Sequence, residues 1–173
     1  GAVPAFATFD GINDFAEVPN DPAFNFTKGV ISIWVQADAY SYNAGFVAIR
    51  GNSSRFSFHL NQALGQIGLW NNSSYTTLNF PGGIEAGKWY HLVFVLDGNG
   101  ANPQLWADGN FIGSFSANIN LSATTEHFVI GSSSGFGEFF KGKLAQVAIF
   151  DSLLATTDMT KLWDEEPVNQ IPH

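Results

Sequence analysis

The sequence has no cysteine and few charged residues. The lack of cysteine excludes thiol catalysis, thiolate zinc sites and a disulfide framework. Seven Lys and Arg stand against fifteen Asp and Glu, a formal net charge of −8. This balance disfavours nucleic acid and anionic membrane surfaces as partners, because both require clustered positive charge. Charged residues make up 13% of the chain, roughly half the usual share in soluble domains. Gly, Ser, Asn and Thr replace them, so the surface is polar but weakly charged.

Long apolar runs are also absent. No stretch approaches the ~18 residues of a membrane span, so we expect no insertion into a membrane. The chain begins at Gly1 without a basic and then apolar leader, and we expect a processed or excised product, or a protein that has lost only its initiator Met. Its 173 residues are enough to bury a two-layer core. Because no linker or low-complexity tract interrupts them, we expect a single domain over residues 1–173.

One strongly apolar stretch, Trp89–Leu96, consists entirely of aromatic, aliphatic and His residues. Neither face of such a strand is polar, so both faces must be covered by other parts of the protein. The pair Asp108-Gly109 follows between Leu105 and Phe111 and predicts a tight hairpin, because Gly accepts the positive φ that such turns need. A strand buried on both faces and followed by a hairpin is typical of the middle of a β-sandwich.

Short apolar runs separated by Gly, Asn, Ser and Pro turns recur along the whole chain. This pattern predicts an all-β protein, a two-sheet antiparallel β-sandwich. Only Thr156–Asp164 has helical spacing, which predicts one short C-terminal helix. The expected strands are Ala5–Phe9, Phe15–Val18, Val30–Gln36, Phe46–Arg50, Arg55–Leu60, Gln66–Trp70, Tyr75–Phe80, Trp89–Leu96, Gln104–Ala107, Phe111–Ser116, His127–Gly131 and Lys143–Phe150.

Several motifs resemble those of laminin-G-like, concanavalin-A-like lectin jelly rolls, a superfamily related to the pentraxins. Residues Trp89–Phe94 resemble the family's Trp-His-His-Val-Ala-Val stretch, and Leu105–Gly113 resembles its hairpin. Further matches follow in the family's order, at Phe9–Phe15, Ile31–Val35, Phe128–Gly131 and Gly142–Asp151. The resemblance implies a jelly roll over nearly the whole chain. It implies less about function, because this fold hosts lectins, adhesion modules, enzyme-appended sugar binders and scaffolds.

A catalytic site is not indicated. A glycosidase on this fold needs two carboxylates across a cleft, and the acidic residues here are single or lie at Asp164-Glu165-Glu166 after the helix. The resemblance also suggests a polysaccharide lyase, but Arg55, His59, Gln66 and Tyr75 have only the residue types of the lyase motifs and not their spacing. We therefore expect a protein that is not an enzyme.

We expect that no cofactor is required and that a calcium site is possible. Calcium takes six to eight oxygen ligands, and the resembling pentraxin loop is rich in acids and amides. Residues 132–140 contain one acid, and Ala145-Gln146 replaces the family's frequent Asp-Glu. Asp10, Asn13 and Asp14 remain as a possible calcium site at an edge, although they are more simply explained as turn formers.

Two residue types that often mark sites are assigned to packing. His91 lies in an apolar strand and matches a family His, so we expect it to be structural. Trp34 and Trp89 match core positions of the family, and packing is their expected role. His127 and His173 have no partner that the sequence indicates.

The most informative surface comes from strand alternation. If the three strands from Arg55 to Phe80 pair as a meander, their outward residues share one sheet face. These outward residues combine aromatic rings with amide, guanidinium and imidazole groups. Sugars need such a mixture, because their C–H faces stack on aromatic rings and their hydroxyls form hydrogen bonds with planar amide, guanidinium or imidazole groups. We expect Trp106 to extend this platform. The predicted ligand-binding residues are Arg55, His59, Gln66, Trp70, Tyr75, Asn79 and Trp106.

The sequence thus predicts an extracellular or surface-exposed, carbohydrate-binding module whose partner is a polysaccharide or glycan. One alternative is an ordinary sheet surface covered by loops such as Tyr40-Ser41-Tyr42. Another is a structural or adhesion domain that binds protein on a virion or cell-surface assembly, for which Phe136, Phe139 and Phe140 in a Ser/Gly loop would provide contacts.

Overall fold

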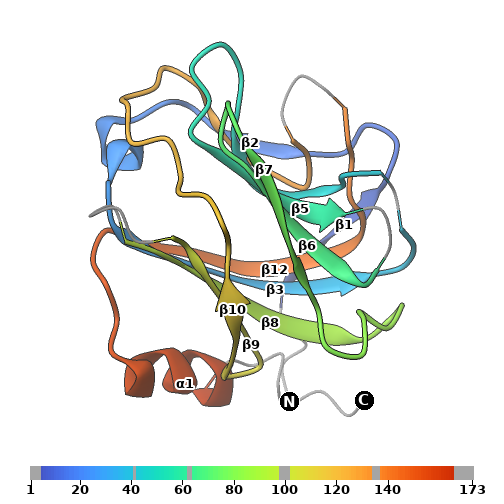
Figure 1. Ribbon diagram of the computed structural model, residues 1–173. Helices are drawn as coiled ribbons and strands as arrows, with labels where there is room; N and C mark the ends of the chain where they lie inside the picture. Colours follow the sequence, from blue (N-terminus) through green and yellow to red (C-terminus); the bar gives the residue numbers. More distant parts are fainter. Residues whose placement is uncertain (1–4, 41, 62–63, 98–101, 134–136, 166–173) are drawn as a thin grey trace.

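The computed structural model describes residues 5–40, 42–61, 64–97, 102–133 and 137–165. Two six-stranded sheets pack face to face, and every strand pair is antiparallel (Figure 1). Sheet A has the order β1(Phe6–Asp10), β12(Lys141–Phe150), β3(Gly29–Ala37), β8(Trp89–Leu96), β9(Gln104–Ala107), β10(Asn110–Ser114). Sheet B has the order β2(Ala16–Val18), β11(Phe128–Ile130), β4(Gly45–Ile49), β5(Phe56–Asn61), β6(Gln66–Trp70), β7(Tyr75–Asn79). The prediction of an all-β sandwich is confirmed.

The core lies between the sheets and is built from the inward-facing residues, which alternate with outward-facing residues along each strand. Phe58 of β5 stacks on Phe94 of β8 across the sandwich, with ring centroids 4.1 Å apart. The other face of β8 is covered as well, since Val93 packs with Met159 outside sheet A. The strand predicted to be buried on both faces is therefore buried on both, because its sequence leaves no polar side for water.

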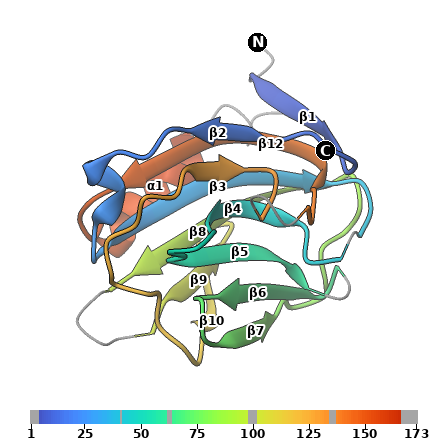
Figure 2. The same cartoon turned by 90° about the horizontal axis from the view of Figure 1, so that it is seen from above.

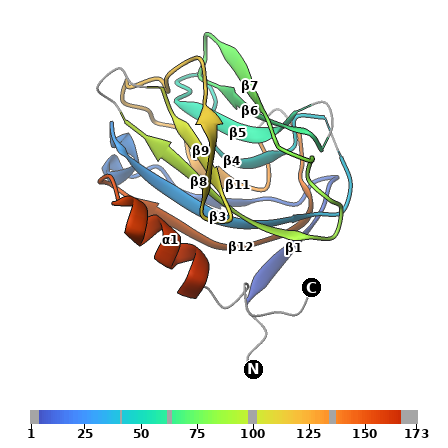
Figure 3. The same ribbon diagram turned by 60° about the horizontal axis from the view of Figure 1, so that its bottom comes forward.

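Helix α1(Thr156–Glu165) covers the outer face of sheet A (Figure 3). Its Trp163 ring stacks on Trp34 of β3 with centroids 5.1 Å apart, and Met159 fills the gap over Val30 and Val93. One outer face of the sandwich is thus partly closed by the chain itself. Within the described ranges no helix is both long and apolar enough to span a membrane.

The consecutive strands β5, β6 and β7 form the predicted meander in sheet B, and β4 pairs with the other side of β5 (Figure 2). Ser57 pairs with Trp70, and Trp70 pairs with Tyr75, so these side chains lie in one row across three strands. The sequence did not predict the 3-10 helix η1(Pro22–Asn25). Its signals are local: Asp21 accepts a hydrogen bond from the backbone N–H of Ala23 at 2.8 Å, and Pro22 occupies the first turn.

Candidate functional site

Five of the predicted residues share the outer face of sheet B. On β5, Phe58 and Leu60 enter the core while His59 points outward. The same alternation places the other four on that face, and the predicted register of the meander is confirmed. These four are Gln66 and Trp70 on β6, and Tyr75 and Asn79 on β7.

Tyr75 is the central exposed ring of this face. Its side chain is 44% exposed and stacks on the His59 imidazole, with centroids 5.5 Å apart and planes 20° from parallel. Both rings lie over Gly68 of β6, where an added Cβ would come within 2.5 Å of His59 Nε2 and 3.1 Å of Tyr75 Oη. The missing side chain at Gly68 is therefore what lets the two rings lie close to the sheet.

A chain of hydrogen bonds runs from Tyr75 across the sheet. The Tyr75 hydroxyl donates to Asn61 Oδ1. Asn61 Nδ2 then donates to Gln66 Oε1 at 2.6 Å, and Gln66 Nε2 donates to Asn79 Oδ1 at 2.9 Å. Asn61 was missed because the expected strand ended at Leu60; one more step of the alternation with Ser57 and His59 would have found it.

Burial fixes the protonation of the two stacked rings. It lowers the pKa of His59 to about 4, and it raises the pKa of Tyr75 to about 12. His59 Nδ1 lies 3.2 Å from the carbonyl oxygen of Ser57, so it carries the proton that is donated to that oxygen. His59 Nε2 is a buried acceptor with no hydrogen-bond partner among the described residues. At neutral pH both rings are uncharged, and His59 is a weak base.

An ion pair that the sequence did not predict borders this face. Arg50 Nη1 lies 2.7 Å from Glu138 Oε2, and both side chains are largely buried. The Arg50 guanidinium carbon also lies 4.5 Å from the centroid of the Trp70 ring. The partly buried indole of Trp70 is therefore covered on one side by Arg50, and Tyr75 offers the more accessible ring. The pair joins positions 88 residues apart, which no local pattern indicates.

The prediction that Arg55 joins this face is wrong. Its side chain is 0% exposed, and its guanidinium donates to three backbone carbonyl oxygens, those of Phe24 and Phe26 at 2.6 Å and that of Asn120 at 3.1 Å. Arg55 precedes β5, so the strand alternation does not extend to it. It instead ties η1 to the connection that leads toward β11.

The prediction that Trp106 extends the platform is also wrong. Trp106 lies on β9, which pairs with β8 in sheet A, and its ring packs against Phe111 of β10 at 5.5 Å. Its Nε1 donates to Gln104 Oε1 at 3.2 Å. Trp106 pairs with Val93 of β8 and therefore lies on the same face of sheet A as Val93, which contacts Met159 of helix α1 on the outer side. Trp106 and Tyr75 thus lie on opposite outer faces of the sandwich, with the core between them.

At the possible calcium site, backbone N–H groups already donate hydrogen bonds to the carboxylates. Asp10 Oδ1 accepts hydrogen bonds from the backbone N–H groups of Ile12 at 2.7 Å and Asn13 at 3.2 Å, which lower the pKa of Asp10. Asp14 Oδ2 accepts from the backbone N–H of Asp10 at 3.0 Å. This is the geometry of a turn. The described residues contain no group of three or more His, Cys, Asp or Glu placed to hold a metal ion.

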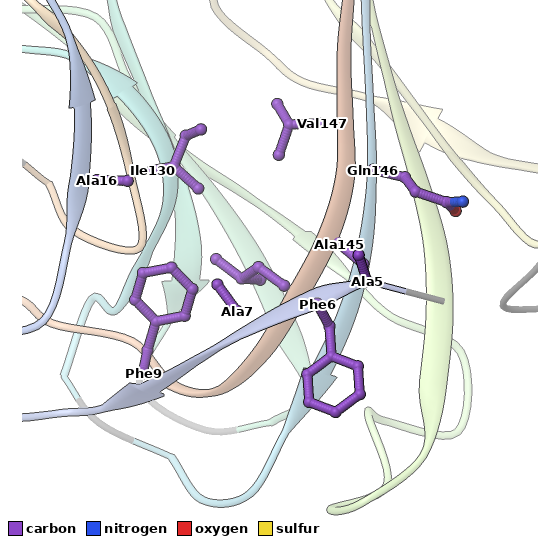
Figure 4. A pocket seen from close by; sticks show the side chains of 10 residues that line it. Ala5, Phe6, Ala7, Phe9, Ala16, Ile130, Ala145, Gln146 and Val147 are labelled. Carbon is purple, nitrogen blue, oxygen red and sulfur yellow. The ribbon is translucent and has the colours of Figure 1, made fainter. Parts of the chain in front are cut away.

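A concave region lies between β1, β12 and the strands β2 and β11 (Figure 4). This pocket of about 280 Å³ is lined by apolar residues such as Phe6, Phe9 and Val147, and the only polar side chain in its lining is Gln146. Such a lining lacks the hydrogen-bonding groups that sugar hydroxyls require. The outer face of sheet B is therefore the better candidate for a polar ligand.

Two six-stranded antiparallel sheets packed face to face, with one short C-terminal helix, define the jelly-roll class of β-sandwiches. The chain belongs to the concanavalin A-like lectin/glucanase superfamily, because the family model Laminin_G_3, "Concanavalin A-like lectin/glucanases superfamily", matches residues 10–159. None of the curated proteins compared with this chain matches it.

Solved structures agree with this assignment. A heptameric SAP-like pentraxin from Limulus polyphemus is 19% identical, with a TM-score of 0.69 over 95% of this chain and 83% of that chain. Domain 4 of an extracellular arabinanase from Geobacillus stearothermophilus, solved with arabinotriose, is 20% identical, with a TM-score of 0.71 over 94% and 82%. A Trypanosoma rangeli sialidase is 14% identical, with a TM-score of 0.72 over 99% of this chain but 29% of its own. At these identities the likeness shows the fold alone.

Proposed function

We propose that this protein is a non-catalytic, extracellular or surface-exposed module that binds a glycan on the outer face of sheet B. The site, called the Tyr75 surface, consists of Tyr75, Gln66 and Asn79, which would contact the ligand, and of His59 and Asn61, which are buried beneath them and support them. The observation that carries the proposal is an exposed aromatic ring beside a continuous row of amide groups.

The chemistry of this surface suits a sugar ring. The exposed face of Tyr75 offers a flat apolar area for the C–H face of a pyranose or furanose. Beside it, the more accessible amides of Gln66 and Asn79 carry both donor and acceptor atoms, which hydroxyl groups need, while the buried Asn61 amide holds Tyr75 and Gln66 in place. The hydrogen bonds among these amides hold them in place before a ligand arrives, so little side-chain entropy is lost on binding.

The comparisons support this proposal from a different direction. The arabinanase domain that is similar to this chain was solved with arabinotriose, and its enzyme is extracellular. The sialidase that is similar over a smaller part of its length has been solved with sialic acid. This chain resembles parts of proteins that handle carbohydrate, and a glycan ligand is the simplest function consistent with its own surface.

The described residues near Tyr75 argue against hydrolysis. The charge of Glu138 helps to raise the pKa of Tyr75, and this carboxylate is bound to Arg50; none of the strands β5, β6 and β7 carries an Asp or a Glu. Glycoside hydrolysis by the common mechanisms needs two carboxylates across the scissile bond. A binding module without catalysis, and without a required cofactor, is therefore the function that we propose.

A binding panel with two matched variants tests the proposal. Tyr75→Ala removes the exposed ring of sheet B, and Phe111→Ala removes a ring that is 51% exposed on sheet A. We expect Tyr75→Ala to weaken binding to any recognised polysaccharide at least about fivefold, or about 1 kcal/mol, and Phe111→Ala to leave it unchanged. Titration calorimetry measures both. Equal losses in both variants, or a loss only in Phe111→Ala, would contradict the proposed location.

Protein binding at another place is a second candidate function. Near the start of the chain, large apolar side chains are exposed at Phe6, Ile12, Phe15 and Val18, with Ile12 71% exposed, and Phe6 also lines the apolar pocket of Figure 4. The loop first expected to make such contacts fits less well. Phe140 is fully buried in the core, Phe139 is partly buried beside Phe15, and Phe136 lies outside the described residues.

This candidate has its own test. Sedimentation of the protein over a range of concentrations, alone and with candidate surface proteins, would detect an apolar contact at this edge. We expect Ile12→Ser to abolish such an association and to leave glycan binding unchanged. An association that survives Ile12→Ser would place the contact elsewhere.

A further inference from the structure

We propose that the glycan recognised by the Tyr75 surface is neutral, a saccharide without carboxylate or sulfate groups. This inference rests on the proposed function and specifies the class of ligand. It follows from where the chain places its positive charges, and from what it places beside the one that borders the surface.

The positively charged side chains are distributed unevenly over the two sheets. None of the six strands of sheet B contains a Lys or an Arg. All five lysines instead lie in or directly before elements of the other side: Lys28 before β3, Lys88 before β8, Lys141 and Lys143 on β12, and Lys161 on α1. Recognition of acidic sugars draws on clustered Arg and Lys, and sheet B has no such cluster.

The two arginines next to sheet B both already bind other groups of the protein. Arg55 is buried and donates to three backbone carbonyls. Arg50 borders the Tyr75 surface, but its charge is balanced by Glu138 at 2.7 Å. A carboxylate that approached Arg50 would meet the Glu138 carboxylate at the same place, and the repulsion would offset the attraction.

The groups of the Tyr75 surface are uncharged, both the exposed ones and the two buried beneath them. Asn61, Gln66 and Asn79 are amides, Tyr75 is a neutral phenol, and His59 is a neutral imidazole at pH 7. Such groups pair with hydroxyls at little desolvation cost, whereas an ionised ligand group placed among them would lose hydration without gaining an opposite charge. The net charge of −8 adds a general repulsion of polyanions.

The experiment is a calorimetric panel of matched saccharides with the whole chain, at low and physiological ionic strength. Galactan is compared with polygalacturonan, xylan with glucuronoxylan, and lactose with sialyllactose, and arabinan is added as a further neutral polymer. We expect the neutral member to bind at least about tenfold more tightly than its acidic partner in every pair that binds. Lower ionic strength should widen the difference, because screening of the repulsion is reduced.

One variant pair then tests the cause. Glu138→Gln leaves the Arg50 charge unbalanced and should raise affinity for acidic saccharides at least about threefold, with neutral binding nearly unchanged. Glu85→Gln removes the same net charge near β8 and should change neither. If acidic members bind as tightly as neutral ones, the inference is wrong while the proposed glycan function stands. If no saccharide binds a protein that melts cooperatively, both are overturned.

Discussion

Two histidines on opposite sheets of this protein look alike by most measures. His59 on β5 and His91 on β8 both point away from the central core, and each is 1% exposed. Each packs against an aromatic ring, His59 against Tyr75 and His91 against Trp34, with centroids 5.5 Å and 5.0 Å apart. Burial lowers the pKa of both to about 4.

What covers them differs. His91 Nε2 lies 2.7 Å from Ser32 Oγ, and Trp163 of helix α1 stacks above it, so His91 joins a helix to a sheet. His59 lies beneath the half-exposed ring of Tyr75, beside the row of amides. Burial and a lowered pKa are thus insufficient to mark a functional residue. The surface that lies over the histidine separates a packing role from a binding role.

The largest effect that this comparison predicts is on stability. Trp34→Ala should lower the free energy of unfolding by roughly 3–5 kcal/mol, because the fully buried indole fills the space between sheet A and helix α1. Tyr75→Ala should cost about 1 kcal/mol or less, as expected of a partly exposed side chain. Urea denaturation measures both. Comparable losses would mean that Tyr75 is as structural as Trp34, and the distinction between the faces would fail.

A second prediction concerns pH. The folded-state pKa of about 4 for His59 and His91 lies below the unfolded value of about 6.5, so the unfolded chain binds more protons between these values. Stability is therefore complete above about pH 6.5 and falls on acidification toward pH 4, by about 1.4 kcal/mol per pH unit for each histidine.

Melting curves between pH 7 and pH 4 for His59→Gln and His91→Gln check this expectation. Each variant should lose about half of the slope over this range. A slope that is unchanged in either variant would show that the histidine in question is not buried in its neutral form.

A smaller effect is expected from added methyl groups on β6 and in the turn before it. A Cβ at Gly68 would meet His59 Nε2 at 2.5 Å, whereas a Cβ at Gly65 would have no atom within 4 Å. Gly68→Ala should therefore push the His59 and Tyr75 rings away from the sheet and weaken glycan binding about threefold to tenfold. Gly65→Ala should bind as the native chain does. Equal binding by both variants would show that ring position over Gly68 is irrelevant.

The smallest effect expected is that of a chelator. Because backbone N–H groups already satisfy Asp10 and Asp14, removing calcium should leave the melting temperature nearly unchanged, whereas a tightly bound ion would add several kcal/mol at large excess. A fall of many degrees in differential scanning calorimetry would instead indicate metal ligands at Asp10, Asn13 and Asp14. It would equally suggest Asp97 with its loop, in which Asn99 lies outside the described residues.

Much of the fold and part of the site could be predicted from the sequence. Period-two alternation placed Trp70 and Tyr75 on one face because β5, β6 and β7 are consecutive and pair without a shift. The same reasoning failed for Arg55, which lies just outside the strand. It failed for Trp106 because local pattern does not say which sheet a strand joins.

Contacts between residues that are distant in sequence could not be predicted from local patterns. The Arg50–Glu138 pair joins the end of β4 to the segment before β12, and only the folded chain brings them together. The covering of sheet A by Trp163 is of the same kind. Local patterns thus predict the alternation within the meander, whereas the covering of one outer face and the balance of the buried charges depend on contacts that form only in the folded chain.

Glycan binding on the outer face of sheet B is tested most directly by mapping the ligand on the protein through amide chemical shifts, during titration with the neutral oligosaccharide that binds best. If the glycan binds on the outer face of sheet B, the shifts will concentrate on β5, β6 and β7 around Tyr75 and Gly68, and amides of β9 and β10 near Trp106 will stay in place. Shifts confined to β9 and β10, or to the edge formed by β1 and β2, would contradict the assignment of glycan binding to the outer face of sheet B.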